Sequence, residues 1–362
     1  MSRRLYTAYR ETRGLRDALR AWDEAIVREE PLRRHAWTSF ALWPVSRSAT
    51  VADSTAIEGN SLTPAQVGEV LSGGSVDGRE QDVREVRNYN AALDLANQAA
   101  LRPRFRWTDE LLRRLNSAVM SGLPGDEGGE YRREQVTVAG AYHPPEAVEL
   151  PGLMDELVAW LQEDDSHPIA RSGLVHLNVA AIHPWLDGNG RTARIAGALS
   201  LTRSGVSSPE LLNVERELRA DRRRYFASLL ESQGQVFDPE NHSATPWLEY
   251  FARVCVRRLE RETRILAAVP GDVGAIALAL VARSEPLDWA PILLAARLSP
   301  IRTTTVASML DRSRPQVRSI LARMAGAGWL VAEGERRGRR YRAGRRLIAL
   351  DLRLPDLVQD EH

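Results

Sequence analysis

The sequence predicts a mainly α-helical protein with one short β-hairpin and, toward its C-terminal end, a small helix-turn-helix module that carries a hairpin of its own. Most segments place apolar residues at helical spacing, whereas runs of β-forming residues are short. Charge gives the third observation: residues 311–346 hold eleven arginines against three acidic residues, a net +8 in a chain whose net charge is +1. This contrast marks residues 311–346 as part of a separate module.

The expected helices follow from apolar periodicity together with caps and stops. Thr108 caps the start of one helix, and Pro184 ends another at His183. The pair Pro270-Gly271 should break the last long helix. In chain order, the expected helices are 5–34, 81–100, 108–120, one from about 150, 171–182, 191–204, 219–233, 245–260 and a linker over 258–267.

The segment His183-Pro-Trp-Leu-Asp-Gly-Asn-Gly-Arg-Thr-Ala-Arg-Ile195 combines groups that handle phosphate. A neutral imidazole such as that of His183 can accept a proton from a hydroxyl nucleophile near neutral pH. Asp187 offers the hard oxygen ligand that Mg²⁺ takes when it also bridges nucleotide phosphates. A base beside a metal ligand predicts an active site.

Anion binding is expected just after this carboxylate. In Gly188, Asn189 and Gly190, successive backbone N–H groups can turn toward one point and form an anion nest at the start of the next helix. Arg191 and Arg194 lie on one face of that helix, and each guanidinium can bind phosphate oxygens as a planar fork. The segment therefore predicts a phosphate-handling site.

This segment resembles the signature of the Fic (Fic/Doc) family, His-Pro-Phe-x-Asp/Glu-Gly-Asn-Gly-Arg-x-x-Arg, with Trp185 in place of phenylalanine. The resemblance implies a mostly helical fold and transfer of AMP from ATP to a Ser, Thr or Tyr hydroxyl of a protein, with release of pyrophosphate. Relatives often carry a histidine where Asn116 stands, a departure that we expect to affect packing more than chemistry. By matching position, the resemblance implies that His183 is the general base, Asp187 the magnesium ligand, residues 188–190 the anion hole, and Arg191 and Arg194 the phosphate clamps.

A second motif lies upstream, where Ser54-Thr-Ala-Ile-Glu58-Gly59-Asn60 matches the inhibitory pattern Ser/Thr-x-x-x-Glu-Gly/Asn of many Fic relatives. Alone, this pattern would also describe a short helix with a glycine stop. Beside the Fic signature it predicts self-inhibition, because a Glu58 carboxylate paired bidentately with Arg194 occupies the guanidinium that should orient the γ-phosphate of ATP. The position of the motif resembles the class with an N-terminal inhibitory helix.

The third matching segment, residues 129–145, contains the β-formers Val136, Thr137 and Val138 and a turn residue at Gly140. It predicts a hairpin before the helix that begins near residue 150. In relatives this region is a flap, whose edge pairs with the target segment and holds the acceptor hydroxyl in line. A surface hairpin without that role fits the sequence equally well.

The basic module resembles a winged helix-turn-helix. A helix over 303–310, a helix over 316–325 that opens with Ser313 and Pro315, and strands at 328–332 and 340–342 follow in that order. In such folds the second helix enters the major groove of DNA and the wing touches phosphates, although the fold also docks on proteins. The candidate DNA contacts are Arg314, Arg318, Arg323, Arg336, Arg337, Arg339 and Arg340.

Composition predicts a cytoplasmic protein. The longest apolar stretch, residues 273–282, is too short to span a bilayer, and the first residues lack the apolar region of a signal peptide, so we expect no membrane partner. Cys255 is the only cysteine and can form no internal disulfide. The histidines other than His183 show no metal-ligand spacing, and His176 is expected to pack within an apolar helix.

The expected function is that of a protein adenylyltransferase that uses Mg-ATP, modifies an unknown target protein and itself, and is inhibited by Glu58. A homodimer is a further expectation. The alternatives are removal of AMP from a modified protein, transfer from another donor, a DNA-binding regulator whose site only senses ATP, and a protein-interaction scaffold. The expected domains are an N-terminal helical region with the inhibitory motif (1–105), a Fic core (106–257), a helical linker (258–285), a winged helix (286–350) and a tail (351–362).

Overall fold

The computed structural model describes residues 4–33, 36–125, 127–138, 140–206, 212–335 and 339–353. Over these residues the chain is mainly helical, with one small sheet of three strands, so the expected mainly α fold class is confirmed. The chain forms two compact units, each made of three segments. Unit 1 consists of Met1–Glu24, Thr50–Leu62 and Gly78–Arg258, and unit 2 of Ala25–Ala49, Thr63–Asp77 and Leu259–His362. The contiguous domain boundaries expected from the sequence stay a prediction.

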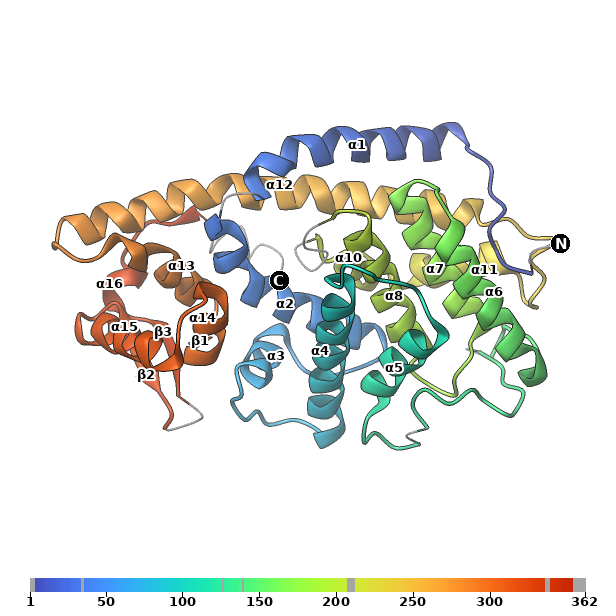
Figure 1. The fold of residues 1–362 in the computed structure, drawn as a ribbon, viewed down its shortest axis with the longest axis horizontal. Coiled ribbons are helices and arrows are strands. Elements are labelled where there is room, and N and C mark those ends of the chain that lie inside the picture. Colours follow the sequence, from blue (N-terminus) through green and yellow to red (C-terminus); the bar gives the residue numbers. More distant parts are fainter. Residues whose placement is uncertain are drawn as a thin grey trace. The chain divides into compact units, whose positions relative to one another are not determined.

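Unit 1 is built around α7 (Pro168–Ile182) and α8 (Asn189–Arg203), which pack against each other (Figure 1). The helices α4 (Glu80–Ala100) and α5 (Asp109–Met120) pack together, and both also contact α8. Helices α1 (Arg13–Arg33), α2 (Ala36–Ile57) and α12 (Thr245–Val281) contribute residues to both units. The other helices of unit 1 are α4 (Glu80–Ala100), α5 (Asp109–Met120), the 3-10 turn η1 (Ala147–Glu149), α6 (Leu150–Glu163), α10 (Val214–Ala220) and α11 (Arg222–Gln233).

An aromatic cluster packs against α7 in the core of unit 1. The ring of Trp247 packs against those of His176 and Phe251, at centroid distances of 4.8 and 5.1 Å. The Trp247 indole also donates to the Gly173 carbonyl at 2.7 Å. His176 is 2% exposed, and its Nε2 lies 2.9 Å from the Tyr225 hydroxyl. Burial lowers the pKa of His176 to about 3, so its imidazole is neutral. Its burial among these rings confirms the expected packing role.

The first helix begins at Arg13, so the helix expected from residue 5 is wrong over its first eight residues. There the chain is held by side chains of the core instead of by helical hydrogen bonds. The Tyr6 N–H donates to Asn178 Oδ1 at 2.8 Å, and the Tyr6 hydroxyl donates to the Gln233 carbonyl at 2.9 Å. Tertiary contacts that satisfy the backbone therefore override the local helical pattern.

The break expected at Pro270-Gly271 is also wrong, because α12 continues through both residues. A proline inside a helix removes one backbone hydrogen bond and usually costs about 3 kcal/mol. Pro270 itself is exposed, whereas Val269 and Ile276 on either side of the pair are fully buried. Burial of apolar side chains on both sides of the proline offsets the lost bond.

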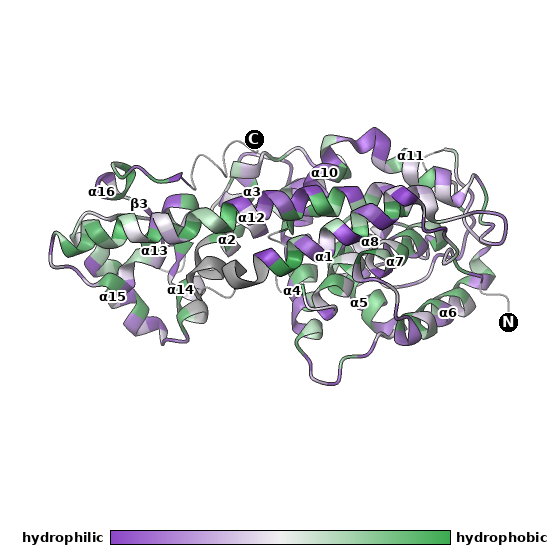
Figure 2. Ribbon diagram, turned by 90° about the horizontal axis from the view of Figure 1, so that it is seen from above, coloured by the Kyte–Doolittle hydropathy of each residue, from purple (hydrophilic) through white to green (hydrophobic). Residues whose placement is uncertain are grey.

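Charged residues gather in the first half of α12 and apolar residues in its second half (Figure 2). Among the helices that the structure describes, α12 is the one long and apolar enough to cross a membrane by length and composition, and 28% of the qualifying window is buried. Core helices of soluble proteins pass the same test, so this property assigns no membrane.

Unit 2 places its sheet beside two consecutive helices. The strands β1 (Ile301–Arg302), β2 (Leu330–Glu333) and β3 (Arg340–Ala343) lie in the order β1-β3-β2 with antiparallel neighbours. Tyr341 of β3 pairs with Ile301 of β1 and with Ala332 of β2. The expected order of helix, helix, strand and strand is found at closely similar positions, but its identification as a winged helix stays a prediction. The elements are α3 (Pro64–Leu71), η2 (Leu287–Trp289), α13 (Ala290–Leu298), β1 (Ile301–Arg302), α14 (Thr303–Leu310), α15 (Arg314–Gly326), β2 (Leu330–Glu333), β3 (Arg340–Ala343) and α16 (Arg345–Ile348).

Candidate active site

His183 follows α7 in a left-handed backbone conformation, with φ 50° and ψ 58°. Such angles are uncommon for residues other than glycine, and here Pro184 prevents the helix from continuing. The His183 N–H still donates to the Val179 carbonyl at 3.2 Å. Its Nδ1 lies 3.2 Å from the Ala180 carbonyl oxygen. Because a carbonyl oxygen only accepts, this contact assigns the proton to Nδ1 and leaves the lone pair of Nε2 free.

The electrostatic surroundings keep the His183 imidazole neutral. Burial lowers its pKa to about 4, although the hydrogen bond to the Ala180 carbonyl favours the protonated form. The positive charge of Arg132 lowers this pKa further. At neutral pH the side chain therefore offers an unprotonated Nε2.

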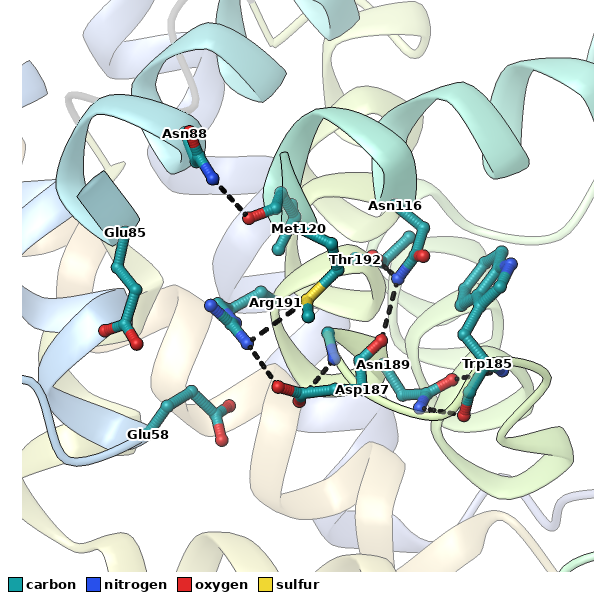
Figure 3. Close-up of polar contacts among 12 residues, drawn as sticks. Glu58, Glu85, Asn88, Asn116, Met120, Trp185, Asp187, Asn189, Arg191 and Thr192 are labelled. Carbon is teal, nitrogen blue, oxygen red and sulfur yellow. Dashed lines mark hydrogen bonds and ion pairs between the residues drawn. The ribbon is translucent and has the colours of Figure 1, made fainter. Parts of the chain in front are cut away.

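The loop after His183 is closed by its own side chains (Figure 3). Asn189 accepts from the Trp185 N–H at 3.1 Å and donates to the Trp185 carbonyl at 2.8 Å. The Asp187 carboxylate accepts from the Gly188 N–H and, at 3.2 Å, from Arg191. Because the Asp187 side chain is 67% exposed, one face of the carboxylate stays open to solvent.

The expected nest over residues 188–190 is replaced by the start of a helix. Only Gly188 among the three has a positive φ, 79°, whereas Asn189 and Gly190 already belong to the first turn of α8. The first N–H groups of a helix lack intrahelical acceptors, and the helix dipole favours negative charge there. Anion binding at this position therefore rests on the helix N-terminus rather than on a three-residue turn.

Both arginines of the motif are buried, Arg191 at 5% exposure and Arg194 at 3%. The Arg194 guanidinium donates to Ser54 Oγ at 2.7 Å and to the Ser54 carbonyl at 3.1 Å. Two of the buried nitrogens, Arg191 Nε and Arg194 Nη1, have no hydrogen-bond partner among the residues that the structure describes. A buried cationic donor without a partner is costly, so the site suits an anionic ligand.

Glu58 lies on Arg194, as expected, but through one oxygen. Its Oε1 accepts from Arg194 Nη2 at 2.8 Å, so the expected bidentate pairing is wrong. Burial alone would raise the pKa of Glu58, but the charge of Arg194 and this hydrogen bond outweigh it and lower the pKa. A Cβ at Gly190 would lie 2.6 Å from Glu58 Oε1, which places the carboxylate at the first turn of α8. In Figure 3, the Glu58 carboxylate points toward Asp187.

The last turns of α2 are held by residues that the sequence analysis missed. Asp53 accepts from Asn213 Nδ2 at 2.9 Å and from Arg219 Nη1 at 2.8 Å. Arg222 Nε donates to the Ile57 carbonyl at 2.8 Å, near the end of the helix. These contacts join residues about 160 positions apart, which no local pattern could reveal.

Asn116 connects three segments around the loop. Its Nδ2 donates to the Asp187 carbonyl at 3.0 Å and lies 3.3 Å from Thr192 Oγ1. Its Oδ1 accepts from the Gly129 N–H at 2.9 Å, and the side chain is fully buried. Asn116 thus supports the backbone of Asp187 and does not contact its carboxylate.

The hairpin expected around residue 140 is reduced to a single bridge. Val138 pairs with Tyr142, and the Val138 N–H donates to the Tyr142 carbonyl at 2.8 Å, whereas Val136 and Thr137 lie outside any strand. Residues 144–145 are both proline and have no N–H to donate, so the second arm cannot extend the ladder.

Unit 2 contains a groove of about 790 Å³ with four arginines in its lining, Arg302, Arg314, Arg318 and Arg339. Three of the candidate DNA contacts therefore come together there. Arg323 instead stacks over the Trp289 ring, 5.3 Å from its centroid. Arg340 pairs with Glu69 and Glu333, which neutralise its charge, so its expected role as a DNA contact is not supported. Arg336 and Arg337 lie outside the residues that the structure describes.

In the comparisons with known proteins, His183, the loop after it and both arginines fall within one stretch that matches a protein family. Residues 106–201 match the Fic/DOC family. The protein adenylyltransferase Fic of Drosophila grimshawi is 33% identical over 195 residues, which are 52% of this chain and 38% of that protein. The chain thus matches well under half the length of this relative.

Solved structures agree with this assignment. A Fic family protein from Desulfovibrio desulfuricans G20 has a TM-score of 0.64 at 25% identity, covering 93% of this chain and 98% of that chain. A Fic domain containing signaling protein from Bacteroides thetaiotaomicron has a TM-score of 0.57 at 21% identity, covering 70% of this chain and 98% of that chain, which shows the fold alone. Residues 106–201 of this chain therefore form a domain of the Fic/DOC family.

Proposed function

We propose that the protein is an adenylyltransferase that moves AMP from Mg-ATP to a Ser, Thr or Tyr hydroxyl of a target protein and of itself. One observation carries the proposal: a neutral imidazole in a loop is followed at once by a helix N-terminus and by two buried guanidiniums with unpaired nitrogens on that helix. The name of the Drosophila grimshawi relative, protein adenylyltransferase, supports the same reaction.

The chemistry uses the groups in fixed roles. The first turn of α8, Arg191 and Arg194 bind the phosphates of ATP and stabilise the charge that develops in the transition state. Nε2 of His183 takes the proton of the attacking hydroxyl while its oxygen bonds to the α-phosphorus. The bond from the α-phosphorus to the bridging oxygen breaks, and pyrophosphate leaves with that electron pair. Positioning and charge stabilisation supply most of the rate gain in such transfers.

Magnesium fits the donor set at Asp187. Mg²⁺ in nucleotide sites is held by one or two carboxylates together with substrate phosphates and waters. The Asp187 carboxylate is exposed and stands beside the proposed phosphate site. When bound, the ion would neutralise phosphate charge and assist departure of pyrophosphate.

Inhibition follows from the position of Glu58. Its carboxylate takes one donor of Arg194 and lies at the first turn of α8, where a phosphate of ATP would bind. A carboxylate there repels the γ-phosphate and withholds Arg194 from it. ATP therefore binds weakly or in an unproductive orientation.

The Glu58→Gly protein, incubated with ATP that carries the radioactive label on either the α- or the γ-phosphate, tests the donor chemistry. AMP transfer predicts protein-bound label from α-labelled ATP and none from the γ-labelled form. Label from both forms, or from γ alone, would point to another donor reaction and overturn the proposal.

The pH dependence of this transfer should be flat around neutrality. Because burial lowers the pKa of His183 to about 4, the base is unprotonated throughout pH 6–8 and is lost only as the pH falls toward that value. We expect rates of the Glu58→Gly protein at saturating Mg-ATP to change less than twofold between pH 6 and 8. A midpoint near pH 6.5 would show an ordinary, solvated histidine instead.

A second activity, DNA binding, is favoured by the arginine groove of unit 2. We propose that Arg314, Arg318 and Arg339 contact the phosphate backbone of a duplex. Log affinity plotted against log salt should fall linearly, and replacing any of these arginines by glutamine should reduce the slope by about 1. The exposed Arg312, which does not line the groove, serves as the control. Salt-independent binding, or equal slopes in all variants, would refute this second role.

A further inference from the structure

Arg132 is a buried arginine next to the catalytic loop, and the proposed mechanism does not use it. It is 1% exposed, and its backbone N–H donates to the Pro184 carbonyl at 2.9 Å. Its side-chain Nε donates to the carbonyl of His183 at 2.9 Å. One residue thus holds two successive carbonyls of the loop that presents the imidazole.

The other side of the same guanidinium holds both ends of the flap, defined here as residues 134–145. Its Nη1 donates to the Glu134 carbonyl at 3.0 Å, and its Nη2 donates to the Pro145 carbonyl. Between these ends, Gln135 Nε2 donates to the Pro144 carbonyl at 2.8 Å. The flap therefore begins and ends on the group that also holds the His183 backbone.

Burying the charged side chain of Arg132 costs free energy, and a purely structural role would not require a charged group here. Burial lowers the pKa of Arg132, which reports an unfavourable surrounding for its charge. Three of its acceptors are neutral carbonyls, and only a planar fork with five N–H donors reaches three directions at once. The carbonyl that Nε holds belongs to His183, whose left-handed backbone is itself an uncommon state.

We propose that Arg132 is a positioning residue for AMP transfer, which couples the flap to the catalytic base by holding the His183 backbone and both flap ends on one guanidinium. The inference rests on the proposed function. Its consequence is that Arg132 sets the alignment of the acceptor hydroxyl with Nε2, and not the affinity for ATP. Misplacement of a reacting group by about 1 Å can cost about 100-fold in rate.

The test compares Arg132→Gln and Arg132→Lys in the Glu58→Gly background, with Arg133→Gln as the matched control, since Arg133 is the exposed neighbour. We expect both Arg132 substitutions to lower kcat of self-modification by about 10- to 100-fold, while KM for ATP stays within twofold. The lysine variant should not recover the rate, because an ammonium keeps the charge but not the fork. The control should keep both constants.

Hydrogen–deuterium exchange gives a readout that needs no activity. Loss of Arg132 should accelerate amide exchange in residues 134–145 and in residues 183–188 together, with α7 and α8 unchanged. Faster exchange in one segment only, in neither, or throughout the domain would overturn the coupling, as would a rise in KM that matches the fall in kcat. If the parent Glu58→Gly protein transfers no AMP, the proposed function fails, and the paired exchange still decides whether Arg132 couples the two segments.

Discussion

Replacing Glu58 by glycine is expected to raise the rate of AMP transfer by about 10- to 100-fold. The carboxylate accepts one charge-assisted hydrogen bond from Arg194, and such bonds contribute about 1.5–3 kcal/mol, which corresponds to this range. Removing this carboxylate frees the guanidinium of Arg194 for the phosphates. Arg194 is 3% exposed, and Ser54 already orients its guanidinium. The measurement is the initial rate of self-modification at saturating Mg-ATP.

Two further substitutions test whether the charge of Glu58, rather than the size of its side chain, inhibits the transfer. Glu58→Gln keeps the size of the side chain but removes its charge, so it should activate in part. Glu85→Gln is the control, because Glu85 is drawn on the same side of the site as Glu58 in Figure 3 but accepts from Asn60 and Gln81 rather than from an arginine. An equal rise in the Glu85 variant, or no rise in either Glu58 variant, would show that the carboxylate of Glu58 does not inhibit.

Loss of His183, the proposed base, should have the opposite effect. In the Glu58→Gly background, His183→Ala is expected to lower kcat by about 100- to 10,000-fold, the usual contribution of a general base. Affinity for ATP should change less than twofold, since the proposal assigns phosphate binding to α8 and its arginines. Rapid-quench measurement of transfer, together with calorimetry of ATP binding, separates the two effects.

His183→Asn is the matched variant for this prediction. Asparagine tolerates the left-handed backbone, and its side-chain N–H can replace Nδ1 as the donor to the Ala180 carbonyl. It has nothing in the place of Nε2. An active asparagine variant would therefore exclude Nε2 as the base, whereas an inactive one with normal ATP binding would support it.

The sequence was sufficient for features that local patterns encode. Pro184 ends α7 at His183, and the helical periodicity around Val317 and Leu321 marks α15. The pairing of Glu58 with Arg194, 136 residues apart, came from resemblance to a family and not from local physics. The motif therefore located the parts of the site, and the structure supplied their contacts.

Contacts between distant residues explain what the sequence did not predict. The sequence around Tyr6 predicts the start of an amphipathic helix, but Asn178 holds the Tyr6 backbone in a non-helical path. Pro270 predicts a break in the helix, but α12 continues through it, because apolar side chains on both sides of Pro270 are buried. The sequence predicts that Arg340 faces solvent on the wing, but the Arg340 side chain contacts Glu69, which lies 271 residues upstream. Periodicity cannot encode a partner that arrives from another part of the chain.

The central claim is tested most directly by intact-mass measurement after incubation with Mg-ATP of three proteins: the wild type, Glu58→Gly, and Glu58→Gly with His183→Ala. The account predicts a gain of whole AMP units in the Glu58→Gly protein alone. Equal gain in wild type would contradict inhibition by Glu58, and gain in the double variant would contradict His183 as the base. No gain in any of the three would contradict self-modification from ATP and leave DNA binding through unit 2 as the activity to pursue.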